Sequence, residues 1–142
     1  MIIAFYACQE MIDLGSFRKA LNNLERGLDR SEAAPDDEEL RDGAIQRFEY
    51  TYELAWKSLK RVLELESASP DVIDMLSFRD LMRLGAERGF IDEPSEWFAF
   101  REERNISSHT YDEAKAAEVY ASALRFRVAA KHLFEKLEAR VL

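Results

Sequence analysis

The sequence predicts an all-α protein, an antiparallel bundle of four to five helices. Glycine and proline, which interrupt helices, number only 5 and 3 among the 142 residues. Residues that favour strands are scarce, with two Thr and five Val, and no segment alternates apolar and polar residues long enough to form a strand. Apolar residues instead recur every three or four positions, which places them on one face of a helix. Because each apolar face needs a partner, packed helices are the expected architecture.

Capping residues mark the starts of the first two helices. Ser16 is a good N-cap for a helix that runs to about Arg30. Asp36 can cap a second, long helix that runs to about Ser67, and the acidic residues that follow it suit the positive end of that helix. Gly43 lies inside this second helix, where glycine costs about 1 kcal/mol relative to alanine. We therefore expect another helix to approach Gly43 closely.

Three further helices follow from similar signals. Ser77 begins a Ser-x-x-Asp capping box for a short helix that ends at Gly89. Pro94 opens a fourth helix, which we expect to end within residues 104–108. Asp112 caps a last long helix, which runs almost to the end of the sequence.

The charge of the chain limits the functions that it can perform. Asp and Glu number 28 against 20 Lys and Arg, a net charge of -8, and apolar residues make up 47%. The apolar fraction argues against disorder, and the acidic balance argues against a protein that coats nucleic acid through a basic field. We expect no DNA partner, and any RNA chemistry must come from a local cationic site. The single cysteine, Cys8, cannot form an internal disulfide, which favours a cytoplasmic location.

The length is that of one domain, which we place at residues 11–142. Residues 1–10 are expected to be an extension without a functional part, or a short arm that packs on a neighbouring molecule. This segment is briefly apolar but has no basic start, and it is shorter than the about 20 apolar residues that a membrane span needs. We expect neither a signal peptide nor a membrane partner.

The residues with the most chemical potential lie between the fourth and the last helix. Arg104 and His109 are five positions apart, which on an ideal helix is a rotation of about 140°. The residues between them are middling or weak helix formers, so we place His109 in a turn and Arg104 on the last turn of the fourth helix. A turn allows the imidazole, which titrates near neutral pH, to come back toward the guanidinium.

This pair suits RNA cleavage by internal attack of the 2′-hydroxyl. His109 would act as general acid or base, and Arg104 would stabilise the charge that builds on the phosphate, without a metal ion. Asn105 could orient the ribose or the phosphate, and Arg101, one helical turn earlier, could extend the cationic strip. Spacing alone also allows an ordinary interpretation, in which the arginine caps a helix and the histidine is a surface or half-buried side chain.

The segment resembles a known family at these residues. Arg104, His109 and Tyr111 form the Arg-x4-His-x-Tyr signature of the HEPN superfamily, in its HepT-type toxin branch. Residues 43–57 are similar to the second-helix block of the nucleotidyltransferase substrate-binding protein family, which belongs to the same superfamily. The resemblance continues through Phe78-Arg79-Asp80 and covers roughly residues 14–140.

The resemblance implies a dimeric HEPN-like bundle in which the Arg/His motifs of two subunits face each other. It implies a metal-independent ribonuclease toxin, with Arg104 and His109 catalytic and with no cofactor of its own. A small nucleotidyltransferase encoded beside it would be the antitoxin, and would silence the nuclease by transferring AMP from ATP to Tyr111. The alternative within the same family is a non-catalytic subunit that binds a substrate or nucleotide for the nucleotidyltransferase.

Other polar and aromatic residues have plainer interpretations. Without the resemblance, Tyr111 would be expected to pack its ring over the preceding turn. Glu49 and Glu53 are one turn apart, and we interpret them as a solvated face or an interhelical ion pair rather than a metal pair. His132 is interpreted as structural. Four aromatic residues are assigned to the core or a dimer interface rather than to base stacking: Trp56, Trp97, Phe98 and Phe100. Three cations are assigned to solvated helix surface: Lys57, Arg79 and Arg83.

Overall fold

The computed structural model describes residues 13–106 and 112–141, and all regular structure in that part of the chain is helical. This confirms the all-α prediction. The six helices are α2 (Gly15–Ala33), α3 (Glu38–Glu66), α4 (Pro70–Asp74), α5 (Phe78–Glu87), α6 (Pro94–Ile106) and α7 (Glu113–Val141).

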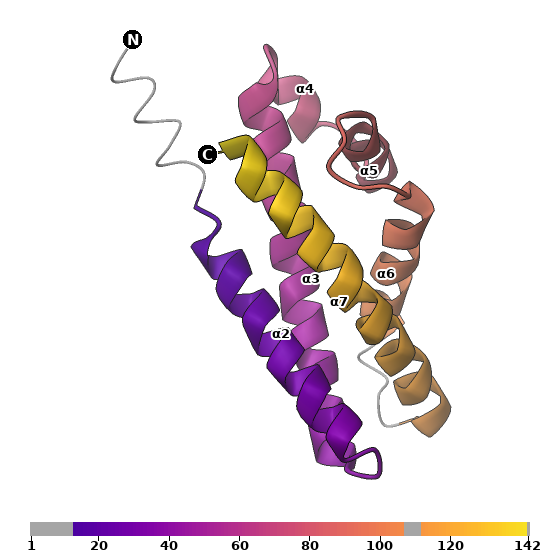
Figure 1. Cartoon of the computed structure of the whole chain (residues 1–142). Coiled ribbons are helices and arrows are strands. Elements are labelled where there is room, and N and C mark those ends of the chain that lie inside the picture. The colour runs from indigo at the N-terminus through magenta and orange to yellow at the C-terminus, as the bar shows by residue number, and fades with distance from the viewer. Residues whose placement is uncertain (1–12, 107–111, 142) are drawn as a thin grey trace.

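Three long helices form the body of the molecule. α2, α3 and α7 lie side by side, and α6 packs against α7 and α3 (Figure 1). α2 and α3 run in opposite directions, as do α6 and α7, so the bundle is built from two antiparallel pairs (Figure 1). α4 and α5 lie at the end of the bundle where α3 and α7 finish, and α5 packs on α6.

Two of the predicted helix caps are confirmed. The Ser77 hydroxyl accepts a hydrogen bond of 3.1 Å from the backbone N–H of Asp80 at the start of α5. The Asp112 carboxylate accepts from the backbone N–H groups of Ala114 and Lys115 at 3.0 and 3.3 Å. Such caps satisfy amide groups that have no partner within the helix, so these two residues fix where α5 and α7 begin.

Two other caps were assigned to the wrong residue. Ser16 lies inside α2, which begins one residue earlier, at Gly15. The N-cap residue is Leu14, which forms no side-chain cap, and the Asp13 carboxylate before it accepts from the Gly15 N–H at 2.8 Å. At α3 the cap is Asp37 rather than Asp36. The short helix α4 was not predicted, because five residues are too few to show an apolar period.

An aromatic cluster centred on Phe126 holds α3, α6 and α7 together. The ring centroid of Phe126 lies 5.2 Å from that of Phe48, 5.7 Å from that of Trp97 and 5.2 Å from that of Phe100, each edge to face. All four side chains are buried. Edge-to-face pairs add to the free energy gained by burial alone, so this cluster sets the position of α6 on the bundle. Trp97 and Phe100 thus belong to the core, as expected.

The prediction about Gly43 was wrong. A Cβ atom built at Gly43 would meet nothing within 4 Å, so no helix approaches there. The close approach is instead at Gly85 of α5, where a Cβ atom would lie 2.9 Å from a methyl group of Leu59 in α3. A side chain at Gly85 would therefore require the Leu59 side chain or α5 itself to shift.

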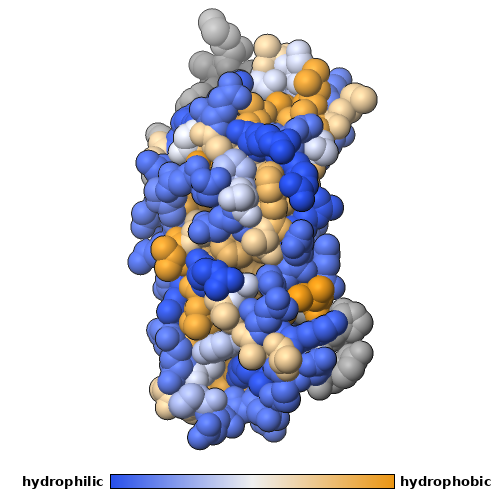
Figure 2. Space-filling model, turned by 90° about the vertical axis from the view of Figure 1, so that its right-hand side faces the viewer, coloured by the Kyte–Doolittle hydropathy of each residue, from blue (hydrophilic) through white to orange (hydrophobic). Residues whose placement is uncertain are grey.

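Seen from the side of α5 and α6, the surface is largely hydrophilic, with smaller apolar areas between the charged side chains (Figure 2). Within the described residues, none of the helices combines the length and apolarity that crossing a membrane would take.

Candidate functional site

α6 carries three of the predicted site residues at its C-terminal end. Trp97 and Phe100 form the buried stripe of this helix, and Arg104 continues the same stripe by one more turn. The Arg104 side chain is consequently only 35% exposed, whereas Arg101 and Asn105 are exposed. His109 and Tyr111 lie outside the described residues, so their positions relative to Arg104 stay a prediction.

A glutamate of α3 lies next to Arg104. The Nε atom of Arg104 is 3.8 Å from the Oε1 atom of Glu53. Glu53 also accepts a hydrogen bond of 3.3 Å from the indole N–H of Trp56 and pairs with Lys57 at 3.6 Å. This ion pair between half-buried groups links the end of α6 to α3. The sequence left two interpretations for Glu53, a solvated face or an interhelical ion pair, and the structure shows the ion pair.

These residues border a cavity of about 330 Å³ between α3, α5 and α6. We call it the Tyr52 cavity. The described residues that line it are Tyr52, Glu53, Trp56, Lys60, Leu76, Phe78, Leu81, Arg101, Arg104 and Asn105.

The Tyr52 cavity is locally cationic although the protein is acidic. Lys60, Arg101 and Arg104 line it, and Glu53 is the one carboxylate among the described lining residues. Lys60 is held by Asp74, whose carboxylate lies 2.7 Å from its ammonium group. An anionic ligand would meet a favourable field here, which the net charge of the whole chain does not provide.

Aromatic rings form much of the wall of the Tyr52 cavity. The rings of Trp56 and Phe78 meet edge to face, with centroids 6.0 Å apart. The guanidinium of Arg101 lies over the ring of Phe78, 4.6 Å from its centroid, in the range of a cation–π contact. Trp56 is partly buried and packs against the hydrophobic core, as expected, and it also lines the cavity that Arg101 and Arg104 line.

The hydroxyl of Tyr52 is buried without a hydrogen-bond partner among the described residues. The side chain is 2% exposed. Burial raises the pKa of the hydroxyl well above its usual range, while the positive charges of Arg101 and Arg104 oppose this rise. The hydroxyl is therefore a neutral hydrogen-bond donor at physiological pH.

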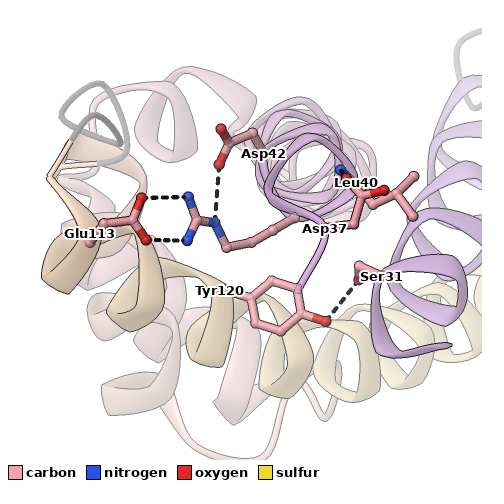
Figure 3. A network of polar contacts seen from close by, with 7 residues as sticks. Ser31, Asp37, Leu40, Asp42, Glu113 and Tyr120 are labelled. Atoms are coloured by element: carbon pink, nitrogen blue, oxygen red, sulfur yellow. Dashed lines mark hydrogen bonds and ion pairs between the residues drawn. The ribbon is translucent and has the colours of Figure 1, made fainter. Parts of the chain in front are cut away.

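A second ion pair holds the start of α7, the helix that follows residues 107–111 in the sequence. The guanidinium of Arg41 in α3 donates to both carboxylate oxygens of Glu113, at 2.7 and 3.2 Å, and to Asp42 at 3.1 Å (Figure 3). The hydrogen bond between Arg41 and Glu113 lowers the pKa of the glutamate and raises the pKa of the arginine. A second link between helices is the 2.7 Å hydrogen bond between the hydroxyls of Tyr120 and Ser31 (Figure 3).

The remaining sequence candidates lie outside the Tyr52 cavity. Arg79 and Arg83 stack on the ring of Phe98, with guanidinium carbons 4.5 and 5.7 Å from its centroid. His132 of α7 lies 3.4 Å from the Asp92 carboxylate, beside a different cavity near the start of α6.

Sequence reasoning missed Tyr52 and Lys60 as residues of this site. Tyr52, Trp56 and Lys60 are spaced four residues apart on α3, which places them on one side of the helix. That spacing was a usable signal. The same three positions also fit the apolar face of a helix with a lysine at its end, so the sequence alone did not distinguish residues of a site from residues of the core.

Comparisons with known proteins agree on one family. The protein family described as nucleotidyltransferase substrate binding protein like matches residues 12–139. A protein of Haemophilus influenzae named probable ribonuclease HepT is 43% identical over 98 residues, which are 69% of this chain and 67% of that protein.

Two solved structures share the fold. One, from Haemophilus influenzae, is described as revealing the fold of a substrate binding domain of a nucleotidyltransferase. It matches with a TM-score of 0.84 and 34% identity, over 89% of this chain and 99% of that one. A crystal structure from Thermus thermophilus matches with a TM-score of 0.69 and 26% identity, over 85% and 98% of the two chains. With a family match over most of its length, the chain belongs to the nucleotidyltransferase substrate-binding protein family.

Proposed function

We propose that this protein is a metal-independent endoribonuclease, the toxin of a HEPN/nucleotidyltransferase toxin–antitoxin pair. The observation that carries the proposal is the pair of arginines near the C-terminal end of α6. Arg104 and Arg101 line one cavity there, on a protein of net charge -8, immediately before the segment that contains His109. The relative named probable ribonuclease HepT supports the same activity.

The reaction requires a proton acceptor, a proton donor and a cation at the phosphate. His109 takes the proton of the 2′-hydroxyl while the 2′-oxygen forms a bond to phosphorus. The bond from phosphorus to the 5′-oxygen breaks, and that oxygen receives a proton from an imidazolium group. The products are a 2′,3′-cyclic phosphate and a free 5′-hydroxyl. Arg104 stabilises the negative charge on the phosphate oxygens, and Asn105 orients the phosphate or ribose.

A homodimer would complete this arrangement. Two copies of the motif facing each other supply two imidazoles, so one can accept the first proton while the other donates the second. They also double the positive charge at the site, which an acidic protein needs in order to bind RNA.

Regulation would act on Tyr111, two residues beyond His109. We expect Tyr111 to lie close to Arg104, and transfer of AMP to its hydroxyl by a partner nucleotidyltransferase would then bring a phosphodiester to the arginines. That negative charge would compete with the RNA phosphate for the same cations, and the adenosine would fill space at the site. ATP is consumed by the partner, so this chain needs no cofactor.

The alternative is a non-catalytic subunit that binds a substrate or nucleotide for a nucleotidyltransferase. The description of the family and that of the Haemophilus influenzae structure favour it. Both functions use the same arginines, but only one of them includes cleavage.

Variants in the presence of EDTA separate the two functions. The wild-type protein, shown by intact mass to carry no AMP, should cleave RNA in excess EDTA. His109→Ala and Arg104→Ala should lower the rate by at least about 100-fold while the helix content stays unchanged. Arg26→Ala, which removes an exposed arginine of α2, is the charge-matched control and should cleave normally. Folded, unmodified wild-type protein that leaves RNA intact would favour the binding subunit.

A further inference from the structure

The unpartnered hydroxyl of Tyr52 is the feature that the proposed cleavage reaction does not use. Its oxygen has less than 1 Å² of exposed surface and no hydrogen-bond partner within the described part of the chain. Buried polar groups in native proteins are nearly always paired, so such a group calls for an explanation. Tyr52 lines a cavity, and a ligand in that cavity is a partner that the free protein lacks.

The surroundings of the hydroxyl restrict what the ligand can be. Trp56 and Phe78 provide aromatic surface, which favours a flat, apolar ring. Lys60, Arg101 and Arg104 provide positive charge, which favours an anion and opposes a cation. The volume of about 330 Å³ is at the small end of the range for ligand sites, so it holds one small group rather than a peptide or a polymer.

A nucleotide combines these properties in one molecule. Its base is a flat ring with hydrogen-bond acceptors at its edge, and its phosphate is an anion within a few bonds of that ring. Inorganic phosphate could use the cations and accept a hydrogen bond from the Tyr52 hydroxyl, but it would leave the aromatic wall without a partner. An uncharged apolar ligand would gain nothing from the positive charge at the border of the cavity.

We propose that the Tyr52 cavity is a nucleobase subsite of the RNA-binding site. The base adjoining the scissile phosphate lies against Trp56 and Phe78 and accepts a hydrogen bond from the Tyr52 hydroxyl. Its phosphate lies at Arg104 and Arg101. The substrate class rests on the proposed function, whereas the nucleotide site itself is a property of the cavity.

Entry of the base requires side chains to move, because less than 1 Å² of the Tyr52 oxygen is exposed in the free protein. Arg101 is exposed, and its guanidinium covers the ring of Phe78. When this side chain leaves the ring, an aromatic face opens and the same guanidinium becomes able to contact the phosphate. During this movement Arg104 stays at the border of the cavity, because it is paired with Glu53. Glu53 itself is held by the hydrogen bond from Trp56 and the ion pair with Lys57.

Titration with single nucleotides tests the subsite without any cleavage. The 3′-monophosphates of adenosine, guanosine, cytidine and uridine contain no phosphodiester bond, so the wild-type protein cannot turn them over. Each is titrated by calorimetry, with ribose 5-phosphate as a ligand that has the sugar and phosphate but no base. We expect at least one nucleotide to bind about 10-fold more tightly than ribose 5-phosphate, as base stacking on aromatic side chains predicts.

A pair of tyrosine variants identifies the group that reads the base. Tyr52→Phe should weaken binding of the preferred nucleotide by about 3- to 10-fold, the loss expected for one hydrogen bond, and leave ribose 5-phosphate unaffected. Tyr120→Phe is the matched control, because it also removes one hydroxyl, from a tyrosine that bonds to Ser31 outside this cavity. It should leave nucleotide affinity unchanged.

The possible results separate this inference from the proposed function. Nucleotides that bind no better than ribose 5-phosphate would overturn the subsite, even if the protein cleaves RNA. An unchanged nucleotide affinity in Tyr52→Phe would overturn the role of the hydroxyl. Tight, Tyr52-dependent nucleotide binding by a protein that cleaves no RNA would uphold the cavity as a nucleotide site and reject the ribonuclease.

Discussion

Replacing Tyr52 by phenylalanine should make the free protein more stable, although it should weaken ligand binding. A buried polar group without a partner destabilises the native state by about 1–3 kcal/mol relative to a paired one. The variant removes that group and keeps the ring, whose centroid lies 6.4 Å from that of Phe48 and 6.2 Å from that of Phe126. The void left by the missing oxygen destabilises the native state by about a few tenths of a kcal/mol, which reduces the gain slightly. We therefore expect a net gain of about 1–2 kcal/mol.

Equilibrium unfolding in urea measures this gain, with Tyr120→Phe as the comparison. The Tyr120 hydroxyl has a partner at 2.7 Å, so its removal leaves the buried Ser31 with one bond fewer and should cost about 1 kcal/mol. The two variants make the same chemical change and should shift stability in opposite directions. A loss of stability in Tyr52→Phe as large as that in Tyr120→Phe would show that the Tyr52 hydroxyl is satisfied and would refute the reasoning.

The same variant has a signature at alkaline pH. Burial raises the pKa of Tyr52, so the native state keeps this proton at pH values where the unfolded chain, with a tyrosine pKa of about 10, loses it. The unfolded state then binds fewer protons, and wild-type stability falls as the pH rises above about 10. Tyr52→Phe has no such proton. Its stability advantage over the wild type should therefore widen between about pH 10 and pH 11.

Three further predictions concern other positions. Gly43→Ala should stabilise the protein by up to about 1 kcal/mol in thermal unfolding, because alanine is the better helix former and its Cβ meets nothing within 4 Å. Asp112→Ala removes a helix cap, so it should destabilise the protein by about 1 kcal/mol and speed amide exchange in the first turn of α7. The control Asp36→Ala removes an aspartate that caps no helix and should change neither quantity. Burial and the charge of Glu118 raise the pKa of Glu103, so the ionised carboxylate destabilises the native state. Glu103→Gln should therefore be more stable than the wild type at about pH 7, and this advantage should shrink toward about pH 4 as the wild-type carboxyl becomes protonated.

The parts of the fold that local chemistry controls could be predicted from the sequence. Ser77 and Asp112 cap their helices because a side-chain oxygen and an amide N–H two or three residues apart find each other without help from the rest of the chain. Ser16 failed because α2 begins one residue before it, at Gly15, whose N–H donates to the Asp13 carboxylate. The residue at which a helix begins depends on how the chain enters it, and a residue pattern does not contain that information.

Properties that depend on packing between helices were harder to predict. Gly43 and Gly85 are both helical glycines, yet only Gly85 lies against another helix, and only the assembled bundle distinguishes them. The pair of arginines near the end of α6 was predicted, since Arg101 and Arg104 are one turn apart on the same helix. The Tyr52 cavity was not, because it exists only where α3, α5 and α6 meet, and the lack of a partner at the hydroxyl among the described residues is a property of that junction.

One measurement tests the central claim most directly. An RNA oligomer and the same sequence with every 2′-hydroxyl methylated are incubated in excess EDTA with the wild-type protein, after intact mass has shown that it carries no AMP. We predict that only the unmethylated RNA is cut, and that its fragments end in a 2′,3′-cyclic phosphate and a 5′-hydroxyl. Cleavage of both oligomers, or of neither by folded protein, would contradict a ribonuclease that uses the 2′-hydroxyl as its nucleophile.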